Sequence, residues 1–108
     1  MLEISARLEE ALNRAFTKVF PQEDRSSKTS SILTGSNLVP ASKPEFGDFQ
    51  INCALSLAKE LKQPPREIAQ QIADQLQKDN DFLKICNAPI IAGPGFINLS
   101  INSKTLLS

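Results

Sequence analysis

One short segment concentrates residue types that bind through flat faces and amide groups. Residues 44–52 read PEFGDFQIN and hold two of the six phenylalanines of a chain without Trp or Tyr. Its aromatic and amide side chains are Phe46, Phe49, Gln50 and Asn52. Such a set suits the unstacked bases of RNA loops, and Lys43 and Arg66 are near enough in sequence to add phosphate contacts. The alternative is that both rings are buried, as aromatic side chains usually are.

Catalytic chemistry finds little support. The chain has no His, so the usual base for a Ser or Cys nucleophile is missing. The paired carboxylates Glu9–Glu10 and Asp79/Asp81 fall on segments predicted to be solvated. The Gly-Pro-Gly run at 93–95 lacks the spacing of a phosphate-binding loop, and its proline removes an amide donor. The Ser/Lys-rich run 26–31 has neither adjacent glycines nor a preceding strand, so it gives no nucleotide-binding loop.

Composition restricts the kind of partner. Twelve basic and twelve acidic residues give a net charge of zero, which argues against gripping nucleic acid by bulk electrostatics. A domain that reads one loop of an RNA held elsewhere remains compatible. Cys53 and Cys86 stand far apart without a His, so we expect no metal site but two small buried hydrophobes in a reducing compartment. No signal peptide or membrane span is visible, and we expect a cytoplasmic protein.

Apolar periodicity and breakers divide the first half of the chain. Helical spacing predicts an amphipathic helix over residues 2–20, which Pro21 ends. Residues 22–31 are all polar and are predicted to form a flexible loop. Two apolar pairs within 31–40 predict one or two short strands.

Two further helices are predicted in the middle of the chain. The first spans residues 49–61, with the carboxylate of Asp48 as N-cap. The second begins at Pro65, which fits a first helical turn. Its expected buried stripe is Ile68, Ala69, Ile72, Ala73 and Leu76.

The C-terminal part reads as a hairpin. A strand is predicted over 85–92, with Pro89 at an edge or bulge. A type II turn is predicted at 93–95, followed by a half-buried strand over 96–101. The strand is expected to turn one set inward (Ile97, Leu99 and Ile101) and the other outward (Asn98, Ser100 and Asn102). The fold class is therefore α+β: a single domain over residues 1–108, with helices covering one face of an antiparallel sheet.

Four motifs occur in a characteristic order. They are FGDFQIN at 46–52, an apolar helix at 54–61, PREIA at 65–69 and IAGPGFIN at 91–98. In order and spacing they resemble the N-terminal additional domain of arginyl-tRNA synthetases, over most of the chain. The resemblance implies a two-layer α-β-β-α-β-β domain that precedes a class I catalytic domain, with residues 103–108 starting the linker.

The resemblance also implies partners. The domain would contact the D-loop at the outer corner of arginine tRNA, while its own catalytic domain, in cis, joins arginine to tRNA with ATP and magnesium. A chain without His cannot hold a HIGH-type ATP motif, and no KMSKS-like signature follows. This fragment is therefore expected to be an inactive monomer without cofactor or metal.

The resemblance places the tRNA-facing surface on the sheet and around the FGDFQIN segment. The expected tRNA-binding residues are Phe49, Gln50, Asn52, Phe46, Asn98, Ser100, Lys43 and Arg66. Phe49 stands where the family often has Tyr, and it is expected to face RNA while Phe46 is the structural ring. The rival hypothesis is a protein-interaction or support module that packs on a catalytic domain.

Overall fold

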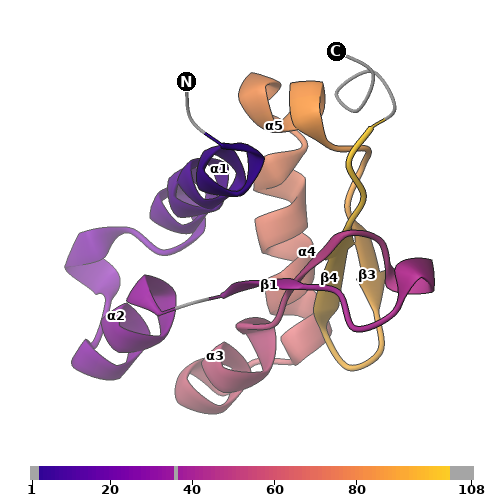
Figure 1. Cartoon of the computed structure of the whole chain (residues 1–108). Helices are drawn as coiled ribbons and strands as arrows, with labels where there is room; N and C mark the ends of the chain where they lie inside the picture. Colours follow the sequence, from indigo (N-terminus) through magenta and orange to yellow (C-terminus); the bar gives the residue numbers. More distant parts are fainter. Residues whose placement is uncertain (1–2, 36, 103–108) are drawn as a thin grey trace.

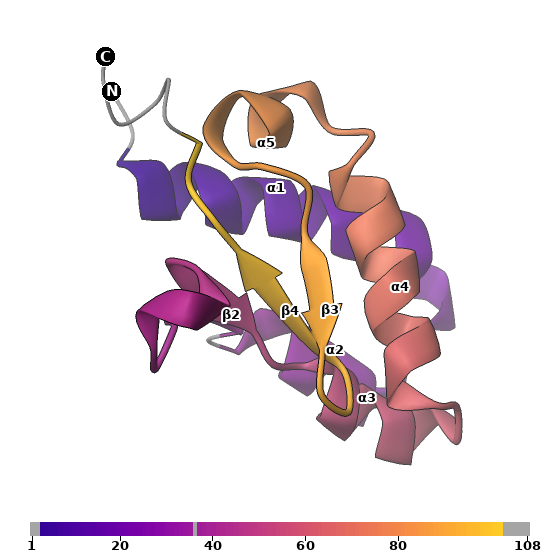
Figure 2. The same ribbon diagram turned by 90° about the vertical axis from the view of Figure 1, so that its right-hand side faces the viewer.

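The computed structural model describes residues 3–35 and 37–102. A four-stranded antiparallel sheet carries helices on one face and no described helix on the other (Figures 1 and 2). The elements in chain order are α1 (Ile4–Val19), the 3-10 turn η1 (Gln22–Asp24), α2 (Ser27–Thr34), β1 (Leu38–Pro40), the 3-10 turn η2 (Pro44–Phe46), β2 (Phe49–Ile51), α3 (Ala54–Leu61), α4 (Pro65–Leu76), α5 (Asn80–Ile85), β3 (Ile90–Ala92) and β4 (Phe96–Leu99). The predicted α+β class is confirmed, with α2 and α5 as additions. The expected linker start at 103–108 lies outside the described residues.

The N-terminal helix follows its sequence pattern. α1 buries one stripe, formed by Leu8, Ala11, Leu12, Ala15 and Phe16. These residues recur every three or four positions, which places them on one side of a helix. α1 packs against α4 and α5, so the predicted first helix is confirmed and its buried side faces the other helices.

The segment predicted as a loop is helical in its second half. Ser26 is the N-cap of α2, because its Oγ accepts a hydrogen bond from the Thr29 amide at 3.1 Å. Thr29 and Leu33 are the two residues that α2 buries. The loop prediction for 22–31 is therefore wrong from Ser27 onward. An N-cap and two inward residues suffice once α2 packs on α3, and of the apolar pairs in 31–40 only the second enters a strand.

The strand order is β1-β2-β4-β3, with every neighbouring pair antiparallel. Residues Phe49–Ile51 form β2 and not the first turn of a helix, because β2 pairs with both β1 and β4. Asp48 is not an N-cap: its Oδ2 accepts from the Ile101 amide at 2.8 Å, and its amide donates to Leu99 O at 2.7 Å. These contacts fasten the start of β2 to the end of β4.

The remaining helices and the hairpin are partly as predicted. α4 begins at Pro65 and buries the whole predicted stripe. α5 was not predicted: Asp79 is its N-cap and accepts from the Phe82 amide at 3.1 Å. α5 shortens the strand predicted over 85–92 to Ile90–Ala92.

The hairpin turn is not type II. The Gly95 amide donates to Ala92 O at 3.3 Å, so Gly93 and Pro94 are the central residues. Gly93 has φ +57°, whereas a type II turn needs a negative φ at the first central position. A glycine with positive φ there matches the right-handed twist of the strands.

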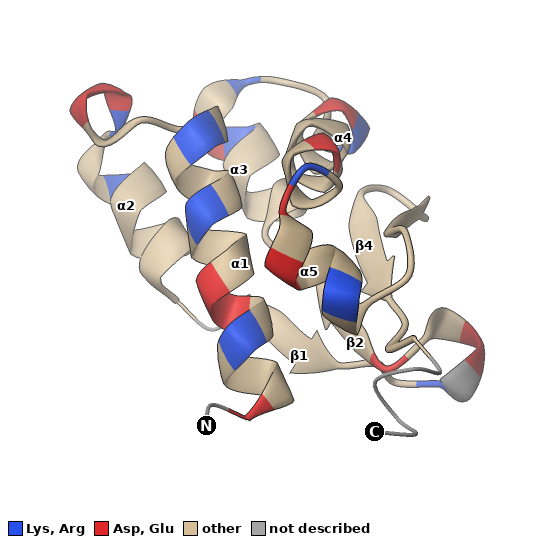
Figure 3. Cartoon of the chain, turned by 90° about the horizontal axis from the view of Figure 1, so that it is seen from above, with Lys and Arg blue, Asp and Glu red and all other residues tan. Residues whose placement is uncertain are grey.

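Two ion pairs connect α1 to α5, whose charged residues lie side by side in Figure 3. Arg14 Nε and Nη2 donate to the Asp79 carboxylate at 2.7 and 3.0 Å, and Arg7 pairs with Asp81. The hydrogen bond from Arg14 holds the pKa of Asp79 below its ordinary value. The hydrogen bond from Arg7 does the same for the pKa of Asp81. Both carboxylates therefore bind their arginine partners more strongly when they are ionised.

These shifts predict acid sensitivity. A carboxyl whose pKa is lowered by folding adds stability above its unfolded pKa, and this is lost as pH falls through the folded pKa. We expect the urea midpoint of unfolding to fall between about pH 5 and pH 2. The double variant Asp79→Asn/Asp81→Asn should show a shallower fall, while the amide oxygen that it introduces at position 79 can still accept a hydrogen bond as the N-cap. Equal pH dependence in both proteins would show that the pairs do not contribute.

Candidate nucleic-acid interface

In each pair of neighbouring strands, two residues of the sheet face without helices stand directly opposite each other. Val39 pairs with Gln50, Gln50 with Asn98, and Asn98 with Ile90. Paired residues point to the same face of a sheet, so these four form one row across all strands, here called the open-face row. The adjacent row contains Ile51 and Ile97, both buried in the core under the helices. The open-face row therefore points away from the helices (Figure 2).

Two amides at the centre of this row bond to each other. Gln50 Nε2 donates to Asn98 Oδ1 at 3.0 Å, and only 9% of Asn98 is exposed. Among the described residues, no buried side-chain nitrogen or oxygen lacks a partner. The atoms left over from this bond, Gln50 Oε1 and Asn98 Nδ2, have no protein partner in the described chain and so reach solvent. The pair thus offers one acceptor and one donor side by side, a pattern that can bond a base edge.

An aromatic ring that the sequence analysis missed flanks this pair. Phe96 precedes Asn98 by two residues in β4, so both side chains share the open face. Phe96 is partly exposed, and Ile90 in the open-face row is 64% exposed. The alternation of side chains along the strand could have predicted this, because Phe96, Asn98 and Ser100 are spaced two residues apart and share one face. An aromatic ring beside paired amides can stack one base while the amides bond its edge.

Of the two rings of the opening motif, the one expected to face RNA packs against the core. Phe49 pairs with Leu99 in the inward set of residues and packs against the hydrophobic core. Phe46, in η2, is partly buried and is not among the described residues packed on that core. Phe49 therefore faces the helices, so it is poorly placed to contact a ligand on the open face.

The other predicted site residues are spread along the sheet. Phe49 pairs with Leu99 and Ile51 with Ile97, so the connection before β2 and the β3–β4 turn lie at opposite ends. Lys43 is exposed in the connection, near the Ser100 end. Exposed Asn52 follows β2 at the other end. Arg66 is also there, since its Nη1 donates to Gly93 O in the turn. The face thus groups Gln50, Asn98 and Ser100, while the two cations stand apart.

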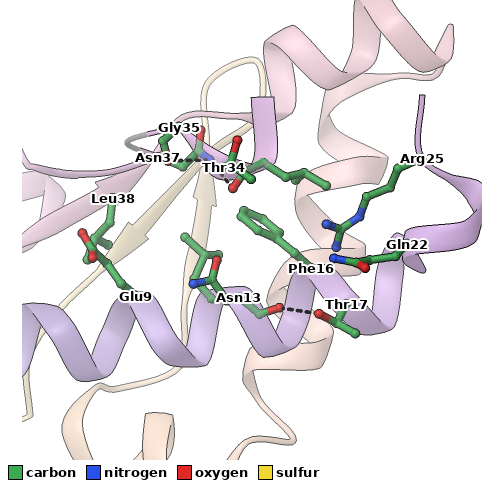
Figure 4. Close-up of a pocket in the computed structure, with 12 residues that line it drawn as sticks. Glu9, Asn13, Phe16, Thr17, Gln22, Arg25, Thr34, Gly35, Asn37 and Leu38 are labelled. Atoms are coloured by element: carbon green, nitrogen blue, oxygen red, sulfur yellow. Dashed lines mark hydrogen bonds between the residues drawn. The ribbon is translucent and has the colours of Figure 1, made fainter. Parts of the chain in front are cut away.

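A concavity lies on the helical side, between α1 and the η1–α2 segment (Figure 4). Its volume is about 480 Å³. Buried Leu12, Phe16 and Leu33 contribute to its lining, and Arg25 donates through Nε to Phe20 O. In Figure 4, Glu9 and Arg25 stand at opposite ends of the hollow. With opposite charges at its two ends, this hollow has no single ligand preference.

Groups for covalent or metal chemistry are not assembled in the described part of the chain. Cys53 and Cys86 are free and buried, and burial raises the pKa of each thiol to about 12. Such thiols stay protonated and unreactive near neutral pH. Within residues 3–35 and 37–102, no three His, Cys, Asp or Glu residues are grouped to hold a metal ion. No helix in these ranges is long and apolar enough to cross a membrane.

Comparison with known proteins adds a family. The profile described as arginyl tRNA synthetase N terminal domain matches residues 3–101. An arginine–tRNA ligase of Prochlorococcus marinus (strain NATL1A) is 90% identical over 108 residues, all of this chain and 18% of the relative. Another from Prochlorococcus marinus (strain MIT 9313) is 52% identical over 98% of this chain and 17% of the relative. The chain therefore spans less than a fifth of the length of these curated relatives.

A solved structure agrees with the fold. Thermus thermophilus arginyl-tRNA synthetase superposes on 97% of this chain with a TM-score of 0.71 and 24% sequence identity. The match covers 15% of that longer protein. At this identity the likeness supports the arrangement of helices and strands.

Proposed function

Since the chain belongs to the arginyl-tRNA synthetase N-terminal domain family, we propose that its open sheet face binds the D-loop at the outer corner of arginine tRNA. The observation that carries the proposal is the Gln50–Asn98 amide pair, flanked by Phe96 on the face that the helices leave open. One base stacks on Phe96 while its edge bonds the amide pair. The parent polypeptide would be an ATP-dependent arginine–tRNA ligase, whose catalytic domain uses magnesium and acts on the same tRNA.

The proposed interface is selective but weak by itself. Base stacking contributes about 1–3 kcal/mol per base, and the net charge of zero offers few phosphate contacts. Affinity in the full-length enzyme would come from tethering to the catalytic domain. We therefore expect the 108-residue chain to bind tRNA weakly, with a shallow salt dependence. Tight binding with a steep salt slope would contradict this arrangement.

Phe96 gives the sharpest test of the interface. Phe96→Leu keeps an apolar side chain but removes the π-face, and it should weaken tRNA binding about 5- to 150-fold. Phe96→Tyr keeps the ring and should bind like the wild type. The measurement is a fluorescence titration against arginine tRNA and against the same tRNA with a replaced D-loop. Phe96→Leu should lower affinity for the first tRNA and change little for the second.

The rival function, a support module packed on a catalytic domain, predicts a different result. Phe96→Leu would then leave tRNA binding unchanged in the chain and would lower the melting temperature of the full-length enzyme. Thermal unfolding of the isolated chain is the control, because a loss of stability there would make weaker tRNA binding uninformative. The specific observation favouring this rival is Ile90, whose 64% exposure leaves apolar surface in the open-face row.

A further inference from the structure

A shallow hollow lies between α2 and α3, which pack side by side (Figure 1). Its volume is about 430 Å³. The residues that line it, here called the α2–α3 groove, are Lys28, Ser31, Ile32, Ser56, Lys59 and Glu60. It is separate from the open-face row, which lies on the sheet.

Each helix gives the groove one ammonium and one hydroxyl. α2 contributes Lys28 and Ser31, three residues apart, and α3 contributes Ser56 and Lys59, also three apart. Residues at this spacing lie on the same side of a helix. All four groups donate hydrogen bonds, and lysine and serine are frequent donors to phosphate oxygens in nucleic-acid complexes. The donor set therefore favours a phosphate group.

Acidic side chains of the described residues do not fully neutralise the lysines of the groove. Neither Lys28 nor Lys59 forms an ion pair with another described residue. Glu60 is the single acid in the lining, and its Oε1 accepts a hydrogen bond from Ser26 Oγ at 3.2 Å. Two ammonium groups against one carboxylate leave the groove positive, in a chain whose total charge is zero.

A short stretch of chain links one end of the sheet to the helix that lines the groove. Ser56 follows the exposed Asn52 by four residues, and Asn52 comes directly after β2. The first turn of α3 therefore leads away from the end of the sheet that holds Asn52. A polynucleotide that contacts the open-face row would have to extend past Asn52 and the start of α3 to reach Ser56 and Lys59.

We propose that the α2–α3 groove binds one backbone phosphate of an RNA, held by both lysines and both hydroxyls. The inference rests on the proposed RNA binding and adds a backbone contact to the base contacts of the open face. It also assigns a role to the Ser/Lys-rich run 26–31. As a sequence this run lacked the features of a phosphate-binding loop, but in the folded chain it supplies half of the donors.

The test compares two double variants of equal charge. Lys28→Gln/Lys59→Gln removes both ammonium groups, and Lys18→Gln/Lys78→Gln removes two exposed lysines, one from α1 and one from the turn after α4. Each is titrated with labelled arginine tRNA at several salt concentrations. Losing one neutralised phosphate should lower the slope of log K against log salt by about one. The control pair should keep the wild-type slope. Because both lysines hold the same phosphate, either single variant keeps one ammonium beside it and should keep most of the wild-type slope.

The outcomes separate this inference from the proposed function. If Lys28→Gln/Lys59→Gln binds tRNA with the wild-type slope and affinity, the groove assignment is overturned and the open-face proposal stands. If the wild-type chain does not bind tRNA, both are overturned.

A third arm distinguishes the source of the phosphate. Inorganic phosphate is added while the amide signals of Ser31 and Ser56 are followed by NMR. Shifts with inorganic phosphate but none with tRNA would replace the RNA assignment with a site for small phosphate compounds. Shifts with tRNA support the assignment, provided that they vanish in Lys28→Gln/Lys59→Gln.

Discussion

Replacing Gly47 with alanine is expected to lower the free energy of unfolding by about 2–6 kcal/mol. Gly47 has φ +94°, a conformation that side chains rarely adopt. An added Cβ would lie 2.6 Å from Leu99 O and 2.8 Å from Ser100 Oγ. Leu99 O also accepts from the Asp48 amide, so it cannot withdraw without breaking the contact that starts β2. The backbone strain and the steric collision therefore both lower the free energy of unfolding.

Gly35 provides the matched control for this substitution. It has φ −77°, and the atom nearest to an added Cβ would be Ile32 O at 3.4 Å. Gly35→Ala should change stability by less than about 0.5 kcal/mol. Urea unfolding of the three proteins measures the difference. Equal midpoints for Gly47→Ala and the wild type would mean that the connection before β2 can relax away from Leu99.

Replacing Phe82 with alanine is expected to cost about 3–5 kcal/mol. Phe82 is 0% exposed and belongs to the core cluster that α1, α4 and the sheet share. Truncation removes apolar surface from water-free packing and leaves a cavity that rigid neighbours fill incompletely. This cost would be a large part of the roughly 5–15 kcal/mol typical of a domain, so we expect partial unfolding at about 37 °C.

The adjacent Leu83 serves as the control because it shares the helix and not the core. Leu83 is 42% exposed, and Leu83→Ala should cost well under the loss caused by Phe82→Ala. Thermal unfolding followed by circular dichroism gives both values. Similar losses for the two variants would indicate that α5 packs loosely as a unit and that Phe82 has no special weight.

The elements predicted correctly are those that carry their own signals. α4 combines a proline at its first position with five apolar residues at helical spacing, and it is helical from Pro65 as predicted. β2 has three residues, and its sequence continues at helical spacing into α3. The ladder with β1 and with β4, which is distant in sequence, decides its conformation. Short strands held by distant partners are where local patterns lose to tertiary pairing.

The candidate site shows the same limit. Composition and motif selected Gln50 and Asn98, which the structure bonds to each other. The family resemblance favoured Phe49 as the ring that faces RNA, but the β2 strand turns Phe49 toward the core. The alternation of side chains in β4 does not depend on β2. It places Phe96 on the same face as Asn98, and it was sufficient to predict Phe96 as a residue of the open face. Which amides meet across strands depends on register, and no local feature of residues 44–52 sets it.

The strand order has a consequence for synthesis on the ribosome. β4 lies between β2 and β3 in the sheet but is the last of the described strands in chain order. β1 and β2 can pair early, whereas β3 has no partner until Phe96–Leu99 has been translated. At translation rates of about 5–20 residues per second, roughly 2–10 s pass between the synthesis of Ile51, the end of β2, and that of Leu99, the end of β4. The sheet is then completed in one late step, so chaperones and proteases meet an unfinished edge until the final motif leaves the exit tunnel.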